Sequence, residues 1–125
     1  MDHSDREFFV PHPIYDIEVS QFGRFKVRIN QSGKTRITKG GRKRRAGYKP
    51  SYEYVVHVQP RGTKNKKESK HKQASHLVLE AFLCSKYDDK VMVDHIDRNS
   101  ENNCIDNLRW ANYFDNNRNR GGRFE

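Results

Sequence analysis

The feature that most constrains the fold of this chain is a short apolar run that ends in two reactive polar residues. Val91–Val93 is followed directly by Asp94 and His95, and an asparagine-rich loop then leads to a second apolar segment over residues 105–110. Two apolar segments joined by such a loop are expected to pair as short antiparallel strands. A carboxylate beside an imidazole at a strand end can hold one hard divalent cation and activate one water molecule.

Length and composition limit what surrounds this segment. A chain of 125 residues forms one small domain or two tightly joined subdomains, without a large core. Hydrophobic residues make up 33% of the chain and charged residues another 33%, so burial has to come from a few aromatic and aliphatic clusters.

The positive charge is concentrated in the middle of the chain. Residues 24–72 contain seventeen Lys and Arg against two acids, a net charge of +15, whereas residues 1–23 sum to −4 and residues 73–125 to −2. A basic stripe of this kind is typical of a protein that binds a phosphate backbone. A solvated surface or a membrane-surface patch is the alternative, but the stripe lacks the apolar helical face that a membrane would need. We therefore expect a nucleic acid as the partner and no membrane.

The cysteines and the termini exclude other classes. Cys84 and Cys104 form no CxxC pair, so a structural zinc site with four ligands is not expected. No N-terminal segment resembles a signal peptide and no segment is apolar enough to cross a membrane. The expected location is cytoplasmic or nuclear, with both thiols reduced.

Alternating residues predict β-structure in the first half. Apolar side chains alternate with basic ones between Phe25 and Ile29, and a Ser-Gly turn follows, so residues 24–38 are predicted to form a hairpin with one basic face. Residues 52–58 are predicted as the next strand. Residues 1–13 are predicted to be an irregular arm, and residues 39–50 and 60–72 to be basic loops.

A helix is predicted before the Asp-His pair and another after it. Residues 75–83 have apolar positions at helical spacing, with Ser75 as the expected N-cap. Val91–Val93 is the predicted strand, and residues 105–110 return onto it with Trp110 as a core residue. Asn112 is expected to begin a final helix that runs to about Asn119.

The stretch from Val93 to Asn116 resembles the ββα-metal site of HNH endonucleases, in particular the phage and intron-encoded homing type. Residues 75–82 are similar to the helix that precedes this site, and residues 17–24 look like an N-terminal module that often accompanies it. The resemblance implies an α+β fold, in which a small antiparallel β module is followed by a ββα-metal (HNH) motif. Residues 1–72 would be the basic β-rich DNA-binding module with its N-terminal arm, and residues 73–125 the nuclease motif.

The residue types explain how such a site would work. A neutral His95 can take the proton from an attacking water, because an imidazole titrates near neutral pH. One carboxylate and one amide oxygen are enough protein ligands for Mg²⁺, which keeps several waters. By the resemblance, Asp94 and Asn116 hold one Mg²⁺ (or Mn²⁺) per site, and Asn107 supports catalysis by pinning the loop that orients His95. A backbone carbonyl is expected to set the tautomer of His95.

Other polar residues near the site are assigned plainer roles. Asn99, Asn102 and Asn103 are expected to form the loop rather than bind metal, and Asp97 to close it by hydrogen bonds. His76 is expected to be a packing or capping histidine. Arg98 stands where the family commonly has glycine, so it either changes the loop conformation or offers an extra phosphate contact.

The function predicted from the sequence is a metal-dependent endonuclease that hydrolyses phosphodiester bonds of double-stranded DNA, by nicking or by cutting both strands. Whether it acts as a monomer or a dimer is left open. The alternatives are a non-catalytic nucleic-acid-binding module on the same scaffold and a structural basic protein. The expected phosphate contacts are Lys26, Arg28, Arg42, Arg44, Arg45, Lys64 and Lys66.

Overall fold

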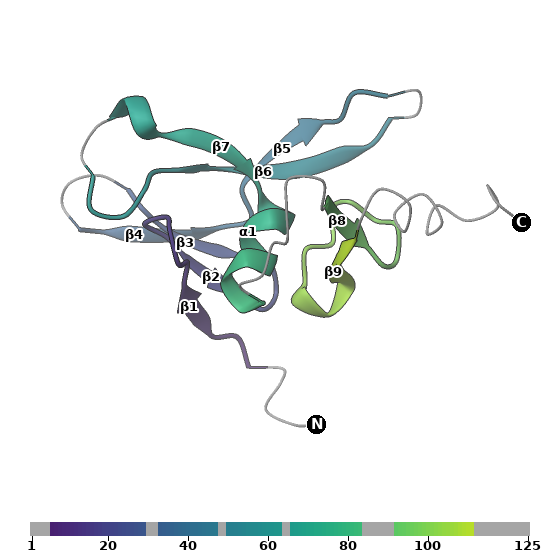
Figure 1. Cartoon of the computed structure of the whole chain (residues 1–125), viewed down its shortest axis with the longest axis horizontal. Helices are drawn as coiled ribbons and strands as arrows, with labels where there is room; N and C mark the ends of the chain where they lie inside the picture. The colour runs from purple at the N-terminus through teal and green to yellow at the C-terminus, as the bar shows by residue number, and fades with distance from the viewer. Residues whose placement is uncertain (1–5, 30–32, 48–49, 64–65, 84–91, 112–125) are drawn as a thin grey trace, which may run out of the picture.

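A computed structural model describes residues 6–29, 33–47, 50–63, 66–83 and 92–111 of the chain. In this part, three small antiparallel sheets surround one α-helix (Figure 1). The first sheet has its strands in sequence order, β1-β2-β3-β4. These strands are β1 (Phe9–Pro11), β2 (Glu18–Ser20), β3 (Phe25–Arg28) and β4 (Thr35–Thr38).

The second sheet contains an exposed strand that carries three of the basic residues in the middle of the chain, Arg42, Lys43 and Arg44. It consists of β5 (Gly41–Arg44), β6 (Tyr52–Val58) and β7 (Lys70–Gln73), with β6 in the centre. A 3-10 turn, η2 (Lys66–Glu68), precedes β7. All four residues of β5 are exposed, whereas Val56 and Val58 on β6 are buried. The sheet therefore has a basic edge supported by an apolar central strand.

Helix α1 (Ala74–Phe82) starts directly after β7 and forms the centre of the core. Its residues Leu77, Val78 and Leu79 are fully buried, and they belong to the same cluster as Phe25 and Val56. The helix contacts β1, β2, β6 and β7 on one side and the third sheet on the other. It therefore joins all three sheets into one packed unit.

The third sheet contains the Asp-His segment. It pairs β8 (Met92–His95) with β9 (Leu108–Ala111), and a 3-10 turn, η3 (Ile105–Asn107), leads into β9. Leu108 and Ala111 are buried, and Val93 and Trp110 pack against the core. The predicted return of the second apolar segment onto the first is confirmed.

A buried histidine ties the N-terminal arm to α1. The His12 side chain is fully enclosed, and its Nδ1 accepts hydrogen bonds from the backbone N–H groups of Ile14 (3.0 Å) and Tyr15 (3.1 Å). Its Nε2 therefore carries the proton and donates to Glu80 Oε1 at 3.0 Å. The arm is thus fixed to the helix by a fully satisfied buried imidazole.

The structure confirms two strand predictions and corrects four details. Residues 24–38 contain the hairpin β3–β4, and β6 has the predicted bounds 52–58. The predicted basic loops 39–50 and 60–72 contain strands β5 and β7, and the arm contains β1. Helix α1 begins at Ala74 and Gln73 is its N-cap, because β7 leads into the helix without a loop; Ser75 is therefore inside the first turn.

The fold of the described residues is mixed, with strands and an α-helix, as the α+β prediction required. The predicted final helix, 112–119, lies outside the described residues. Among the residues that are described, no helix is long and apolar enough to span a membrane.

Candidate active site

Strand β8 places Asp94 and His95 on opposite faces of the β8–β9 pair, because successive side chains alternate along a strand. Asp94 is opposite Arg109 in the antiparallel register and His95 is opposite Leu108. The carboxylate of Asp94 is only 3% exposed, and its Oδ2 accepts a hydrogen bond from Arg109 Nε at 2.8 Å. This charged pair holds the carboxylate in one orientation beneath the sheet surface.

His95 is oriented by a side chain rather than by the backbone carbonyl that the sequence led us to expect. Its Nε2 lies 2.9 Å from Oδ1 of Asn103, which is 6% exposed. An amide oxygen only accepts hydrogen bonds, so Nε2 carries the proton and the lone pair of the neutral ring is on Nδ1. Asn103, expected only to form the loop, is therefore the residue that sets the tautomer of His95.

Asn107 connects the two ends of the loop between β8 and β9. Its Oδ1 accepts from the backbone N–H of Asp97 (2.9 Å), and its Nδ2 donates to Asp97 Oδ1 (2.8 Å) and to the carbonyl of Asn102 (2.9 Å). Its own carbonyl accepts from the N–H of Ile96 at 2.8 Å. These bonds lie where a loop-pinning amide was predicted.

Asp97 organises the inside of the same loop. Its pKa is lowered by hydrogen bonds from the side chain of Asn102 and the backbone N–H of Asn99, and Asn107 adds a further bond. Arg98, the next residue, adopts a φ of +64°, the left-handed conformation that glycine tolerates best. The loop thus keeps the conformation of a glycine-containing turn, with an arginine in the strained position.

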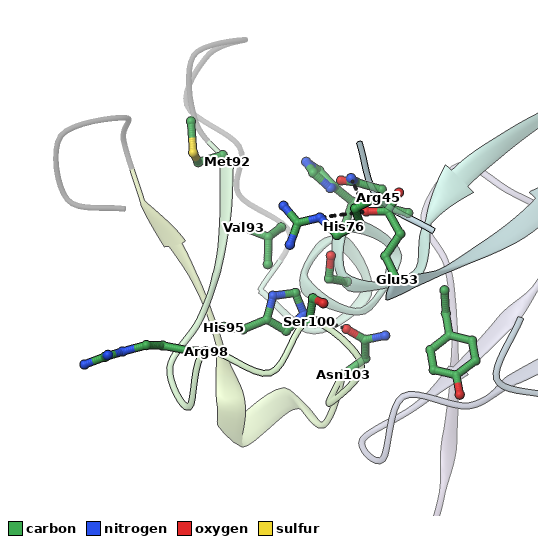
Figure 2. Close-up of a pocket in the computed structure, with 12 residues that line it drawn as sticks. Arg45, Glu53, His76, Met92, Val93, His95, Arg98, Ser100 and Asn103 are labelled. Carbon is green, nitrogen blue, oxygen red and sulfur yellow. Dashed lines mark hydrogen bonds and ion pairs between the residues drawn. The ribbon is translucent and has the colours of Figure 1, made fainter. Parts of the chain in front are cut away.

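His95 faces a pocket of about 310 Å³ that lies between the second and third sheets (Figure 2). Arg45, Glu53 and Gln73 line it from the basic sheet, and His95, Ser100 and Asn103 line it from the β8–β9 hairpin and its loop. Glu53 accepts from Gln73 Nε2 at 3.0 Å and lies 3.7 Å from Arg45 Nε. Figure 2 shows the side chain of Arg98 extending away from His95.

His76 lines this pocket from the first turn of α1. Its ring makes an edge contact with Trp110, with the ring centroids 5.6 Å apart. Trp110 is packed against the core as expected, so the observed contact supports a packing role for His76.

The predicted phosphate contacts fall into two groups. Arg42, Arg44 and Arg45 belong to β5 and its end, next to the pocket: Arg42 Nε lies 2.9 Å from Glu101 Oε1 in the site loop. The guanidinium of Arg42 also stacks on the ring of Tyr52, 3.8 Å from its centroid. The structure therefore places Arg45 at the pocket that His95 faces and Arg42 against the site loop.

The other group lies on the first sheet and in the segment before β7. Lys26 lies over the ring of Phe9, and Arg28 Nε lies 3.3 Å from Asp16 Oδ2. Lys66 begins η2, and Lys64 lies outside the described residues. The structure does not bring Lys26 and Arg28 into the pocket.

The donor set for a metal is described only in part. Asp94 supplies a hard carboxylate oxygen, which fits Mg²⁺ or Mn²⁺, whereas the expected second ligand, Asn116, lies outside the described residues. Within those residues no cluster of three or more His, Cys, Asp or Glu side chains could hold a metal. The chemistry of Asp94 fits the expected cation, which takes most of its ligands from water.

Comparisons with known proteins show which family and which fold this chain is similar to. Residues 72–118 match the family model described as HNH endonuclease. A solved structure of the HNH homing endonuclease I-HmuI, a protein described by its DNA binding and cleavage, is similar to this chain. The two structures superpose with a TM-score of 0.59, and their sequences are 25% identical. That match covers 94% of this chain and 59% of the I-HmuI chain, so this chain spans less than two thirds of its length. No curated protein matches the sequence.

The matched family segment contains Asp94, His95 and Asn107 together with the helix before them. The resemblance to HNH endonucleases that the sequence indicated is therefore confirmed, and the fold is similar to that of an HNH homing endonuclease.

Proposed function

We propose that this chain is a metal-dependent endonuclease that hydrolyses phosphodiester bonds of double-stranded DNA. The observation that carries the proposal is the hydrogen bond from His95 Nε2 to Asn103 Oδ1 at the wall of a pocket beside a basic strand. It fixes the imidazole in the tautomer with a basic Nδ1, as a general base requires. The similarity to the HNH family and to I-HmuI supports the same reaction.

In the proposed reaction, His95 Nδ1 removes a proton from a water molecule as the water oxygen forms a bond to phosphorus. The bond between phosphorus and the 3′-oxygen breaks, leaving a 5′-phosphate and a 3′-hydroxyl after protonation. Asn103 accepts the hydrogen bond from His95 Nε2–H throughout the reaction, so the imidazole does not rotate while Nδ1 gains and loses a proton.

Asp94 and Asn116 are the proposed ligands of one Mg²⁺ or Mn²⁺. When bound, such a cation would neutralise negative charge on the leaving oxygen. The ion pair with Arg109 keeps the Asp94 carboxylate aligned. Asn107 and Asp97 keep the intervening loop closed, so that Asp94 and His95 hold their positions at the end of β8.

The basic strand β5 is the proposed DNA-binding surface next to the site, with Arg42, Arg44 and Arg45 as phosphate contacts. Lys26, Arg28, Lys64 and Lys66 would extend the contact along the duplex. Binding that neutralises roughly six to ten phosphates weakens by about 10³- to 10⁵-fold between 50 and 200 mM salt. A steep salt dependence is therefore expected.

A non-catalytic nucleic-acid-binding module is the competing proposal, because the basic strand would serve it equally well. The ion pair of the buried Asp94 with Arg109 and the oriented His95 argue against it, since binding phosphates requires neither.

A supercoiled-plasmid assay separates the two proposals. With Mg²⁺, the wild-type protein is expected to produce nicked or linear DNA, and excess EDTA to stop it. His95→Ala should lower the cleavage rate by about 10²- to 10⁴-fold while DNA affinity stays unchanged, because only the general base is lost. His57→Ala is the matched control, since His57 is an exposed histidine on β6 outside the pocket. Equal cleavage by His95→Ala and His57→Ala would refute the proposed mechanism.

A further inference from the structure

Gly23, in the turn between β2 and β3, lies directly against the residue that orients His95. A side-chain carbon placed on Gly23 would come within 2.7 Å of the carbonyl oxygen of Asn103 and 2.9 Å of its Cβ. Atoms this close cannot coexist without movement of the Asn103 backbone, since the contacts are with its backbone and Cβ and not with the flexible end of a side chain. Only glycine fits here without displacing Asn103.

The contact between the β2–β3 turn and the site loop extends to the residues next to Gly23 and Asn103. The backbone N–H of Ile105 donates to the carbonyl of Gln21 at 2.9 Å, and the thiol of Cys104 lies 3.8 Å from the carbonyl of Phe22. Three consecutive turn residues, 21–23, therefore pack against three consecutive residues of the site loop, 103–105.

The turn is itself rigid. Ser20 is completely buried, and its hydroxyl oxygen accepts from the backbone N–H groups of Phe22 (3.2 Å) and Arg24 (3.1 Å). Gly23 has a φ of +79° and donates its N–H to the carbonyl of Ser20 at 3.1 Å. A turn with so few degrees of freedom can act as a fixed support for the loop.

We propose that the β2–β3 turn of the N-terminal sheet is part of the catalytic apparatus, as a positioning element that acts on His95 through Asn103. The inference rests on the proposed role of His95 as the general base. Gly23 and Asn103 touch no reacting atom. They set the position and the tautomer of the imidazole, so that errors in the turn lower the rate of the chemical step and leave DNA affinity intact.

Gly23→Ala tests whether the β2–β3 turn holds Asn103 in position. Its matched control is Gly62→Ala, because Gly62 has a similar left-handed φ of +85° but an added Cβ would meet nothing within 4 Å. Both variants carry the same backbone strain, and only Gly23→Ala displaces Asn103. We expect the single-turnover cleavage rate of Gly23→Ala to fall by about 10- to 100-fold relative to Gly62→Ala, with unchanged affinity for duplex DNA. Equal rates in the two variants would overturn the proposal.

Asn103→Asp tests the tautomer without depending on the stability of Gly23→Ala. A carboxylate would accept the same Nε2–H bond, whereas Asn103→Ala removes the acceptor. The single-turnover cleavage rate of Asn103→Asp should therefore stay within a few-fold of the wild-type rate, while that of Asn103→Ala should fall by about 10- to 100-fold. Equal rates in the two variants would count against Asn103 as the positioning residue.

A measurement that needs no cleavage separates this inference from the proposed function. Long-range ¹⁵N–¹H spectra assign the proton of His95 to Nε2 or Nδ1. We expect a single Nε2–H form in the wild type and in Gly62→Ala, and a mixture in Gly23→Ala and in Asn103→Ala. A mixture in the wild type would overturn the positioning role, whereas a pure Nε2–H form without plasmid cleavage would uphold it and refute the nuclease.

Discussion

Replacing Arg98 with glycine is expected to stabilise the protein. Arg98 has a φ of +64°, and a residue with a Cβ in the left-handed region costs roughly 1–2 kcal/mol. Glycine removes this strain but loses about 0.4–1 kcal/mol through the greater freedom of the unfolded chain. The side chain of Arg98 is exposed and extends away from His95, so little packing is lost (Figure 2). The free energy of unfolding should therefore rise by about 0.5–1 kcal/mol.

Arg98→Ala is the control, because alanine keeps the Cβ and the strain while removing the guanidinium. In a chain of this size we expect the melting midpoint of Arg98→Gly to lie about 2–4 °C above that of Arg98→Ala, measured by circular dichroism at one pH and salt concentration. DNA affinity, measured in parallel, should fall equally in both variants if the guanidinium binds a phosphate. A melting midpoint of Arg98→Gly at or below that of Arg98→Ala would refute the assignment of strain to this position.

Two further predictions concern the carboxylates of the site. Asp94→Ala should lose cleavage that extra Mg²⁺ or Mn²⁺ restores only in part, and full activity of this variant in the plasmid assay would remove Asp94 from the proposed ligand set. The pKa of Asp97 is lowered in the folded protein by its hydrogen bonds from Asn102 and Asn99. The ionised Asp97 therefore stabilises the fold fully above the pKa of the unfolded chain, about 3.9, and this contribution is lost as the pH falls through the lower pKa of the folded protein. Asp97→Asn should therefore be less stable than the wild type at neutral pH and should lose that difference in acid below about pH 4, as followed by urea unfolding; a difference that persists at the lowest pH would contradict the argument.

Hydrophobic alternation predicted the strands that bury an apolar face. The hairpin β3–β4 and strand β6 follow from the regular spacing of Phe25, Val27, Val56 and Val58, and the β8–β9 pair from two apolar segments around a polar loop. In each case the signal is local, because the buried side chains lie within the strand itself.

Strands β5 and β7 could not be predicted in the same way. Gly41–Arg44 has no apolar residue and all its side chains are exposed, and Lys70–Gln73 is equally polar. They become strands because both edges of β6 offer backbone hydrogen-bonding groups, and the pairing satisfies them. Charged edge strands also discourage pairing with other chains. The charged residues that make these strands hard to predict from the sequence therefore protect the sheet edges from aggregation.

The candidate site shows the same division between local and distant information. The adjacent Asp94 and His95 could be singled out from residue types and spacing, whereas the role of Asn107 in the loop was implied by the resemblance to HNH endonucleases. Asn103 could not, because several asparagines lie around it and its burial comes from Gly23, far earlier in the sequence. The contact that sets the tautomer of His95 is tertiary, and nothing in the loop sequence distinguishes Asn103 from Asn102.

The charge distribution suggests that DNA binding and DNA cleavage belong to separate parts of the chain. The contacts of β5 show that the two parts are nevertheless connected. Arg42 forms an ion pair with Glu101, and Ser100 donates a hydrogen bond to the carbonyl of Tyr52, so the basic hairpin is attached to the loop that contains Asn103. An exposed ion pair contributes little to overall stability, so this one biases the loop position without holding the fold together. Removing Arg42 therefore disturbs the loop as well as a proposed phosphate contact, whereas Arg44, exposed on the same strand, forms no ion pair with the described part of that loop. Binding and cleavage should separate cleanly at Arg44 but not at Arg42, because Arg42 belongs both to the proposed DNA-binding surface and to the support of the loop that orients the proposed general base.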